Sequence, residues 1–336
     1  MGIKNNAWKL ARRPTGDIEQ GDLEWVSETL VDPADGEICV RHVYLSLDPT
    51  NRIWMSDIDQ YMPPVGIGDV MRGGTLGIVE ASNADGYAVG DWVNGMGGWQ
   101  KYTVGAANQW QILPKDAGLP MTAFMGCLSF IGMTAYFGLL DICDPKPGET
   151  VVVNAAAGAV GSLVGQIAKI KGARVVGIAG TDDKCSWIKD ELGFDEAINY
   201  KSENVLEALK KHCPDGIDCV FENVGGQILD DELTLMNNFS RISLCGLIST
   251  YNDLDAPGPK MFRNILMKRI MIKGFIVSDY MDRAQEAMEE MGKWMMEGKL
   301  QYRIDVRPGL ENAPQEVKDL FVGGNTGKLM IQISEE

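Results

Sequence analysis

Glycine and alanine are concentrated at one turn of the sequence, in the stretch VVVNAAAGAVGSLVGQIAK from Val151 to Lys169. The stretch begins as a β-branched run and ends as an amphipathic helix, a setting typical of a dinucleotide site. Gly158 would let the backbone approach a pyrophosphate, and Gly161 would let the helix pack closely on the strand. Alanine stands where the first glycine is usual, so Ala156 should avoid a positive φ. A bare turn with small residues is the alternative. The predicted pyrophosphate-binding residues are Ala156, Gly158, Ala159, Val160 and Gly161.

The end of the next predicted strand indicates which dinucleotide would bind. An NAD site needs an acidic residue about 20 residues further on, which accepts from the ribose 2′-OH. Gly180 and Thr181 occupy that place and leave space, while Lys184, one helical turn later, could meet a 2′-phosphate. Asp182 and Asp183 would oppose a phosphate unless they point away, and Lys184 could also be an ordinary solvated lysine. The pattern favours NADP over NAD.

The sequence argues against a catalytic zinc. Such a site needs Cys, His or carboxylate ligands and an open coordination position. The chain has two histidines, His42 in a predicted strand and His212 near the end of a basic-rich helix, with no Gly-His-Glu triplet and no four-cysteine lobe. We predict that no metal is bound.

Strand–helix alternation between about residues 126 and 299 supplies the elements that position these groups. Near-continuous apolar strands separated by helices predict a parallel sheet buried on both faces. Six strands are the number in a complete dinucleotide-binding fold. The predicted strands are 150–156, 173–180, 196–200, 216–226, 240–250 and 269–279. The apolar stretch 127–142 is too short for a membrane span, so it predicts a buried helix.

The flanking residues predict a second, mostly antiparallel β domain. Alternating segments at 37–49, 74–83 and 90–105 read as strands. The segments 302–310 and 327–334 also read as strands, with no crossover helix expected between them. The C-terminus should therefore return to the first domain, which gives one domain from 1–125 with 300–336 and a nucleotide-binding domain from 126–299.

Composition excludes several classes of partner. The formal net charge is −16 and no basic block occurs, which argues against nucleic acid and against anionic lipid. Seven scattered cysteines without a CxxC pair are typical of reduced thiols in a cytoplasmic protein.

Motifs along nearly the whole chain resemble one family. They are LSLDPTNR (45–52), GMTAYFGLLDIC (132–143), NAAAGAVGS (154–162), GIAGTDDK (177–184), NYK (199–201), ENVGG (222–226), CGLISTYN (245–252) and GGNTGK (323–328). Their combination resembles the zinc-independent branch of the medium-chain dehydrogenase/reductase superfamily, and more narrowly its NADPH-dependent alkenal/enone reductases, which include prostaglandin and curcumin reductases.

The resemblance implies a GroES-like β domain beside a Rossmann NADP-binding domain, and it implies roles for individual residues. Lys184 and Tyr200 would hold the adenosine 2′-phosphate, and Asn223 would bond to ribose or nicotinamide. The remaining implied cofactor contacts are Gly180, Thr181, Thr134, Phe275, Val277 and Asn325. The chain departs from its relatives at Thr50-Asn51 and Phe130-Ile131, near the expected substrate pocket.

Tyr251 is the candidate for the chemical step. A hydride that reaches the β-carbon of an enone leaves an enolate oxygen, which needs a preorganised donor. A phenol is neutral at pH 7 and donates one hydrogen bond. Tyr251 follows the predicted strand 240–250, at the edge where α/β sites form, and the family places a tyrosine there near the substrate carbonyl. A core or rim tyrosine is the alternative.

Apolar side chains should line the substrate pocket, although most such residues are simply core. The wall candidates are Trp54, Tyr61, Met62 and Met261, and the loop 251–262 is long enough to cap a site.

We expect an enzyme that reduces the C=C bond of small apolar enones or enals. A quinone reductase and an inert NADP-binding structural or sensor protein are the alternatives. An uncovered apolar edge strand at 269–277 predicts a homodimer.

Overall fold

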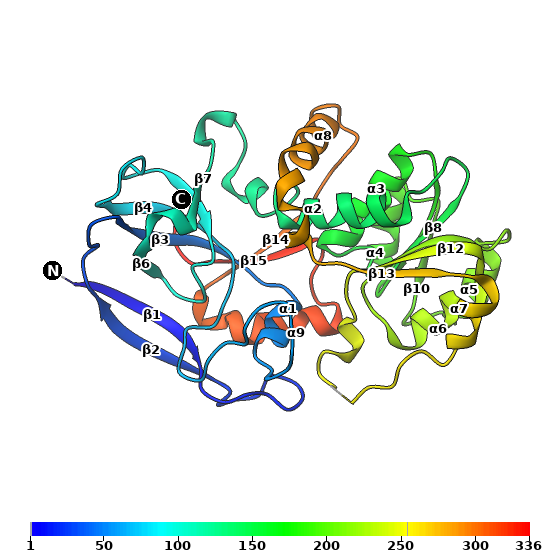
Figure 1. Cartoon of the computed structure of the whole chain (residues 1–336), viewed down its shortest axis with the longest axis horizontal. Helices are drawn as coiled ribbons and strands as arrows, with labels where there is room; N and C mark the ends of the chain where they lie inside the picture. Colours follow the sequence, from blue (N-terminus) through cyan, green and yellow to red (C-terminus); the bar gives the residue numbers. More distant parts are fainter. Residues whose placement is uncertain (1, 254) are drawn as a thin grey trace. The chain divides into compact units, whose positions relative to one another are not determined.

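The computed structural model describes residues 2–253 and 255–336, and these form two compact units (Figure 1). Unit 1 comprises the chain up to Met125 together with Ile304–Asn325 and Leu329–Glu336. Unit 2 comprises Gly126–Arg303 and Thr326–Lys328. The chain thus enters unit 2 at the predicted residue and leaves it a few residues after the predicted end. That these units are independent domains stays a prediction.

Unit 2 is built on a six-stranded sheet, with strand order β10-β9-β8-β11-β12-β13. All five pairings are parallel. The strands are β8 (Thr150–Val153), β9 (Arg174–Ala179), β10 (Glu196–Asn199), β11 (Ile217–Glu222), β12 (Met236–Leu244) and β13 (Met271–Gly274). The order runs outward in both directions from β8, which is the Rossmann arrangement, so the predicted fold class is confirmed.

Helices cover both faces of this sheet. One core cluster joins the sheet to α2 (Phe130–Phe137), α3 (Ala159–Ile170) and α8 (Ala284–Met296), and the other joins it to α5 (Val205–His212), α6 (Gly226–Leu235) and α7 (Phe262–Lys268). A π-helical turn, Gly138–Cys143, extends α2, so the predicted helix at 127–142 is confirmed as mostly buried. The helix α4 (Asp182–Ser186) begins at Thr181, whose side chain accepts from the backbone N–H of Lys184, as expected of an N-cap.

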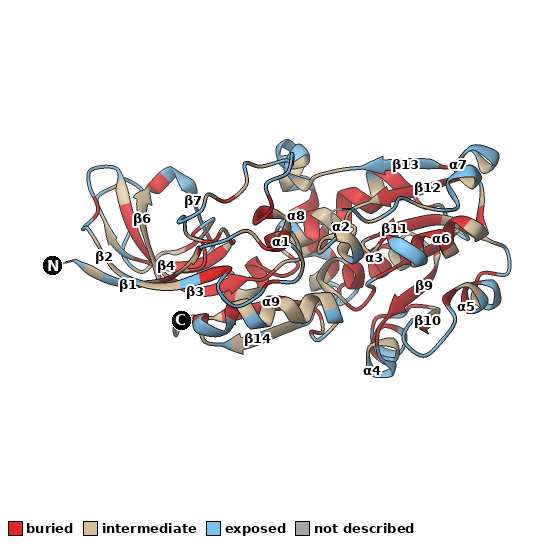
Figure 2. Cartoon of the chain, turned by 90° about the horizontal axis from the view of Figure 1, so that it is seen from below, coloured by how far each residue is buried: buried red, intermediate tan, exposed pale blue. Residues whose placement is uncertain are grey.

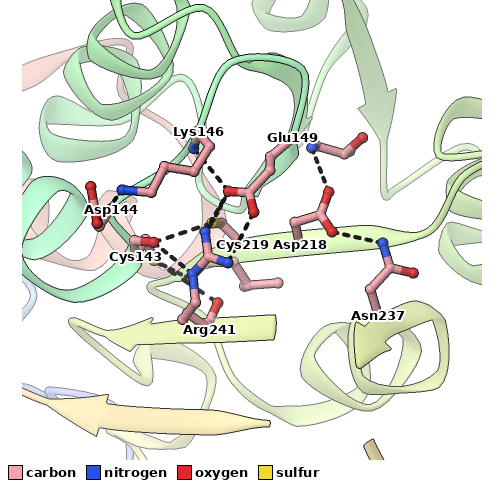
Figure 3. Close-up of polar contacts among 10 residues, drawn as sticks. Cys143, Asp144, Lys146, Glu149, Asp218, Cys219, Asn237 and Arg241 are labelled. Carbon is pink, nitrogen blue, oxygen red and sulfur yellow. Dashed lines mark hydrogen bonds and ion pairs between the residues drawn. The ribbon is translucent and has the colours of Figure 1, made fainter. Parts of the chain in front are cut away.

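A polar network holds the amino-terminal ends of β8 and β11 together (Figure 3). The Arg241 guanidinium contacts both carboxylate oxygens of Glu149 and donates to the carbonyl of Cys143 and to Cys219 Sγ. Asp218 accepts from the backbone N–H of Thr150. This network lies at the end of the sheet opposite the glycine-rich turn.

Unit 1 contains a seven-stranded sheet and a separate hairpin. The sheet order is β14-β15-β3-β4-β5-β7, with β6 paired to β3. The strands are β3 (Glu37–Ser46), β4 (Thr75–Ser82), β5 (Trp92–Gly95), β6 (Tyr102–Ala106), β7 (Trp110–Ile112), β14 (Ile304–Pro308) and β15 (Lys328–Gln332), with the hairpin β1 (Ile3–Leu10) and β2 (Leu23–Leu30) and the short helix α1 (Thr50–Trp54). The C-terminal strands thus join the first sheet, as predicted.

One expectation for this region is wrong. A helix, α9 (Ala313–Val322), lies between β14 and β15, where the sequence was expected to run without one. Pro314 stands in its first turn and Gly323, with φ 69°, ends it in the left-handed conformation. Its apolar contact is small, since Ala313 and Val317 are its buried residues.

Candidate functional site

The glycine-rich turn begins where β8 ends and leads directly into α3. Ala156 does not have a positive φ, as expected; the positive φ, 47°, falls one residue earlier, at Ala155. A Cβ placed on Gly161 would lie 2.4 Å from the Ala155 carbonyl oxygen and 2.9 Å from Ala156 Cα, so only glycine lets α3 approach the strand. Gly158 immediately precedes α3, and Ala159 and Val160 begin its first turn, where backbone N–H groups can receive an anion.

A segment near the C-terminus pairs with the glycine-rich turn. Gly158 forms an isolated parallel bridge with Gly327, whose N–H donates to the Ala157 carbonyl at 2.9 Å. Asn325 lies two residues before the bridge but is grouped with unit 1. Its place over the pyrophosphate therefore stays a prediction.

The carboxyl end of β9 brings together two of the residues expected at the 2′-phosphate, Gly180 and Tyr200. A Cβ on Gly180 would lie 3.0 Å from Tyr200 Cε1 and 3.2 Å from its Oη, so the tyrosine ring covers the glycine. Burial raises the pKa of Tyr200, which keeps its phenol a neutral donor. Asp182, one of the two carboxylates that would oppose a phosphate, accepts from Asn199 Nδ2 at 2.6 Å.

Asn223 follows β11 and is fixed by Asn154, at the end of the neighbouring strand β8. Its backbone N–H donates to Asn154 Oδ1 at 2.6 Å, and its Nδ2 donates to the Asn154 carbonyl at 3.0 Å. Behind it lie Glu222 and Glu232, both fully buried. Sequence reasoning did not single out Glu222, Asn154 or Glu232 as site residues. A polar residue directly after an apolar strand, as at Asn154 after β8, was the sequence signal that could have indicated a site residue.

Tyr251 lies on the loop that follows β12, directly after a 3₁₀ turn at Ile248–Thr250. Its Oη accepts from the backbone N–H of Leu247 at 3.0 Å, and a Cβ on Gly246 would lie 3.0 Å from this oxygen and 3.4 Å from the Asn223 carbonyl oxygen. The structure therefore brings Tyr251 and Asn223 to the same edge of the sheet. A hydroxyl that accepts a hydrogen bond becomes a better donor, because linked bonds polarise one another.

The residues predicted beside the nicotinamide come from two further elements. Thr134 lies in α2, and its hydroxyl donates to the Phe130 carbonyl of the preceding turn at 2.6 Å. Phe275 packs edge-on against Phe221 and fills the space over Gly138, where a Cβ would meet its ring at 2.4 Å. Val277 begins the next 3₁₀ turn. Contact of these residues with a cofactor stays a prediction.

The structure groups three of the four proposed pocket residues in unit 1. Trp54 Nε1 donates to Tyr61 Oη at 3.0 Å, and Thr50 Oγ1 lies 2.6 Å from the same oxygen. Met62 packs against the core cluster of that unit. Met261 belongs to unit 2, where its N–H donates to Asp230 and its side chain is exposed. Thr50, where the chain departs from its relatives, therefore contacts Tyr61, a predicted pocket residue.

Asn51 and Phe130, two other positions where the chain departs from its relatives, have different surroundings. Asn51 is buried and bonds to the Asp48 N–H and the Arg72 carbonyl. Phe130 is 47% exposed at the start of α2. Asn51 therefore holds the local backbone, whereas Phe130 presents an apolar ring at the surface of unit 2.

Two sequence matches, two relatives and one solved structure identify the family. Residues 6–113 match the family described as "N-terminal domain of oxidoreductase", and residues 159–296 match "Zinc-binding dehydrogenase". NADPH-dependent curcumin reductase of Escherichia coli is 44% identical over 98% of this chain and 97% of its own length. The NADP(+)-dependent 2-alkenal reductase of Nicotiana tabacum is 39% identical over 99% of both chains. CurA from Vibrio vulnificus, crystallised with NADPH, matches with a TM-score of 0.94 at 45% identity, over 98% of this chain and 100% of that one. The chain belongs to the medium-chain dehydrogenase/reductase superfamily.

Within that superfamily, the chain is an NADP(H)-dependent double-bond reductase of the alkenal and curcumin reductase group. The residues of this reductase fit a dinucleotide, since a Cβ at Gly161 would fill the space that lets α3 approach the turn after β8. At the end predicted to hold the 2′-phosphate, the Tyr200 ring covers Gly180, and the Asp182 carboxylate of α4 accepts from Asn199 Nδ2.

Both histidines of this reductase have partners within the fold. His42 is buried between the Gln100 carbonyl and the Thr103 hydroxyl, and burial lowers its pKa to about 4. His212 pairs with Glu196. Within residues 2–253 and 255–336, no three His, Cys, Asp or Glu side chains are grouped as a metal site requires. In the same residues, no helix has the length and apolar character needed to cross a bilayer.

Proposed function

We propose that this reductase transfers hydride from NADPH to the β-carbon of α,β-unsaturated aldehydes and ketones. The observation that carries the proposal is the shared position of Tyr251 and Asn223 at the carboxyl edge of the sheet, beside the glycine-rich turn. The names of the curcumin and 2-alkenal reductases support the substrate class. NADPH, when bound, supplies the hydride.

The roles of the side chains follow from their chemistry. Tyr251 donates a hydrogen bond to the substrate carbonyl, where negative charge develops as the β-carbon is reduced. The Leu247 N–H bond to its Oη fixes the phenol before substrate arrives. Lys184, Tyr200, Gly180 and Thr181 hold the 2′-phosphate, and the first turn of α3 holds the pyrophosphate. Trp54, Tyr61, Met62 and Met261 are the proposed apolar walls.

Turnover is tested by loss of NADPH absorbance with a 2-alkenal, a benzalacetone-type ketone and a quinone. The alkenal and the ketone should be reduced, and Tyr251→Phe should lower kcat by about 10- to 1000-fold, as for other single oxyanion donors. Unchanged kcat in this variant would remove Tyr251 from the mechanism. Reduction of the quinone alone would favour the quinone reductase, and tight NADPH binding without any oxidation would favour the inert alternative.

We also propose a homodimer through the edge of the unit 2 sheet, in a cytoplasmic protein. β13 pairs with β12 on one side, and all four of its residues are exposed, as Figure 2 shows in pale blue. Met271 and Ile272 present apolar side chains there. An uncovered strand of this kind can pair with its own copy. Light scattering at micromolar concentration should give the dimer mass, and a monomer would contradict the proposal.

A further inference from the structure

Two carboxyl groups meet in the interior of unit 2, behind the loop that carries Asn223. Glu222 is the last residue of β11 and Glu232 lies in α6, and both side chains are fully buried. The Asn154 amide bridges them, with Nδ2 2.8 Å from Glu222 Oε1 and 3.3 and 3.4 Å from the two oxygens of Glu232. Buried carboxylates this close cannot both be ionised without a large cost.

Glu222 is the member of the pair whose surroundings favour a carboxylate. Its Oε1 accepts from Asn154 Nδ2 and also from the backbone N–H groups of Val224, at 2.6 Å, and Gly225, at 2.7 Å. Three donors on one oxygen stabilise a carboxylate. Its Oε2 is buried and has no hydrogen-bond partner in the described part of the chain. A hydrogen on the Glu232 carboxyl group would supply the donor that this oxygen needs.

Glu232 is the member that keeps a proton. Burial, and next the charge of Glu222, raise the pKa of Glu232 well above the ordinary value for a glutamate. Other titratable groups act on the pair or are affected by it. Asp230 and Asp231 lie on the same helix, Asp230 accepting from the Met261 N–H and Asp231 from Gln227. Cys213 and Cys245 are neutral thiols whose pKa burial raises to about 12, and Lys268 of α7 donates to the Thr234 carbonyl.

Asn154 connects the pair to the cofactor edge. Because its Nδ2 faces two carboxyl groups, its Oδ1 must face the other way, where it accepts from the Asn223 N–H. The amide orientation, and with it the position of Asn223, depends on acceptors behind it. The N–H bonds of Val224 and Gly225 to Glu222 fold the rest of the 222–226 loop around the same carboxylate.

We propose that Glu222 and Glu232 share one proton, and that this proton holds the 222–226 loop and Asn223 in the conformation that binds the ribose and nicotinamide of NADPH. Glu232, Glu222 and Asn154 are positioning residues, since they act through Asn223. Loss of the proton places two negative charges in one buried site, which opens the loop and weakens cofactor binding. The inference rests on the cofactor of the proposed function but not on its substrate.

The test is the dissociation constant of NADPH, measured by fluorescence without alkenal between pH 7 and 10, above the titration of the 2′-phosphate. For the wild type, binding should weaken by up to about tenfold per pH unit once the pair loses its proton, as expected for one linked proton. Glu232→Gln cannot lose a proton there, so its affinity should stay at the wild-type value of pH 7. Asp231→Asn removes a charge that helps to raise the pKa of Glu232, so its profile should keep the wild-type slope but begin to weaken at a slightly lower pH.

A Glu232→Gln profile with the wild-type slope would overturn the proposal. A second measurement needs no variant: at high pH, the wild type should take up a proton when NADPH binds, which an indicator dye detects in weak buffer. No uptake would also overturn it, as would failure of the wild type to bind NADPH at any pH. Normal pH-linked binding without turnover of any alkenal would instead contradict the proposed function alone.

Discussion

Replacing Gly161 with alanine tests the glycine-rich turn most directly. The added Cβ would lie 2.4, 2.9 and 3.0 Å from three backbone atoms of Ala155 and Ala156, none of which can rotate away. Alanine favours a helix interior by about 1 kcal/mol over glycine, but overpacking against rigid neighbours costs about 1–3 kcal/mol or more. We therefore expect Gly161→Ala to lower the free energy of unfolding by up to about 2 kcal/mol, the difference between these terms.

Gly292 is the matched control, because it lies inside α8 and its added Cβ would meet nothing within 4 Å. Gly292→Ala should raise the free energy of unfolding by about 0.5–1 kcal/mol. Urea denaturation of both variants measures the difference, and NADPH titration should show weaker binding in Gly161→Ala alone. Equal stability of Gly161→Ala and the wild type, with unchanged NADPH affinity, would refute the close approach of α3 to the turn.

Two further predictions concern the cofactor site. Lys184→Ala should weaken NADPH binding by about 10- to 100-fold and leave NADH binding unchanged, since a bond to a charged group contributes about 1.5–3 kcal/mol. Lys189→Ala, which removes a lysine paired with Glu196, is the control. Equal losses of affinity for NADPH and NADH in Lys184→Ala would contradict a role at the 2′-phosphate. Glu232 has a raised pKa in the folded chain, whereas a glutamate in the unfolded chain loses its proton near its ordinary pKa of 4.5. Between these two pKa values the folded chain binds one more proton, so the free energy of unfolding falls as pH rises from 4.5 towards the folded pKa. Chemical denaturation at pH 6 and pH 9 should show this fall in the wild type, and it should be smaller in Glu232→Gln.

The sheet of unit 2 could be predicted from sequence because its strands are buried on both faces. All four residues of β8 are buried, and an unbroken apolar run of this kind is typical of a central parallel strand. The glycine turn and the Thr181 cap were predictable for the same local reason, since each depends on residues close together in the chain. Such signals identify the edge where a cofactor binds.

Local pattern was less informative at strand ends and in short amphipathic segments. The predicted strand 269–279 pairs only over β13, because Arg269 has a φ of 52° and Phe275 turns inward to pack over Gly138. The helix α9 was missed although Pro314 and Gly323 mark its ends. Two buried residues over ten positions give a weak periodic signal.

The acid pair could not be predicted from local pattern at all. Asn154 is 68 residues from Glu222 and 78 from Glu232, and a glutamate in an amphipathic helix normally faces solvent. Only the fold shows that Glu232 points inward. A backbone carbonyl or a water could accept from the N–H groups of the 222–226 loop without carrying a charge. The Glu222 carboxylate, with three donors, holds the loop firmly only while Glu232 stays protonated. The pair acts on Asn223 through Asn154, which bonds to both carboxyl groups and to the Asn223 N–H. Cofactor affinity at high pH is therefore the measurement that reports on the protonation of the pair.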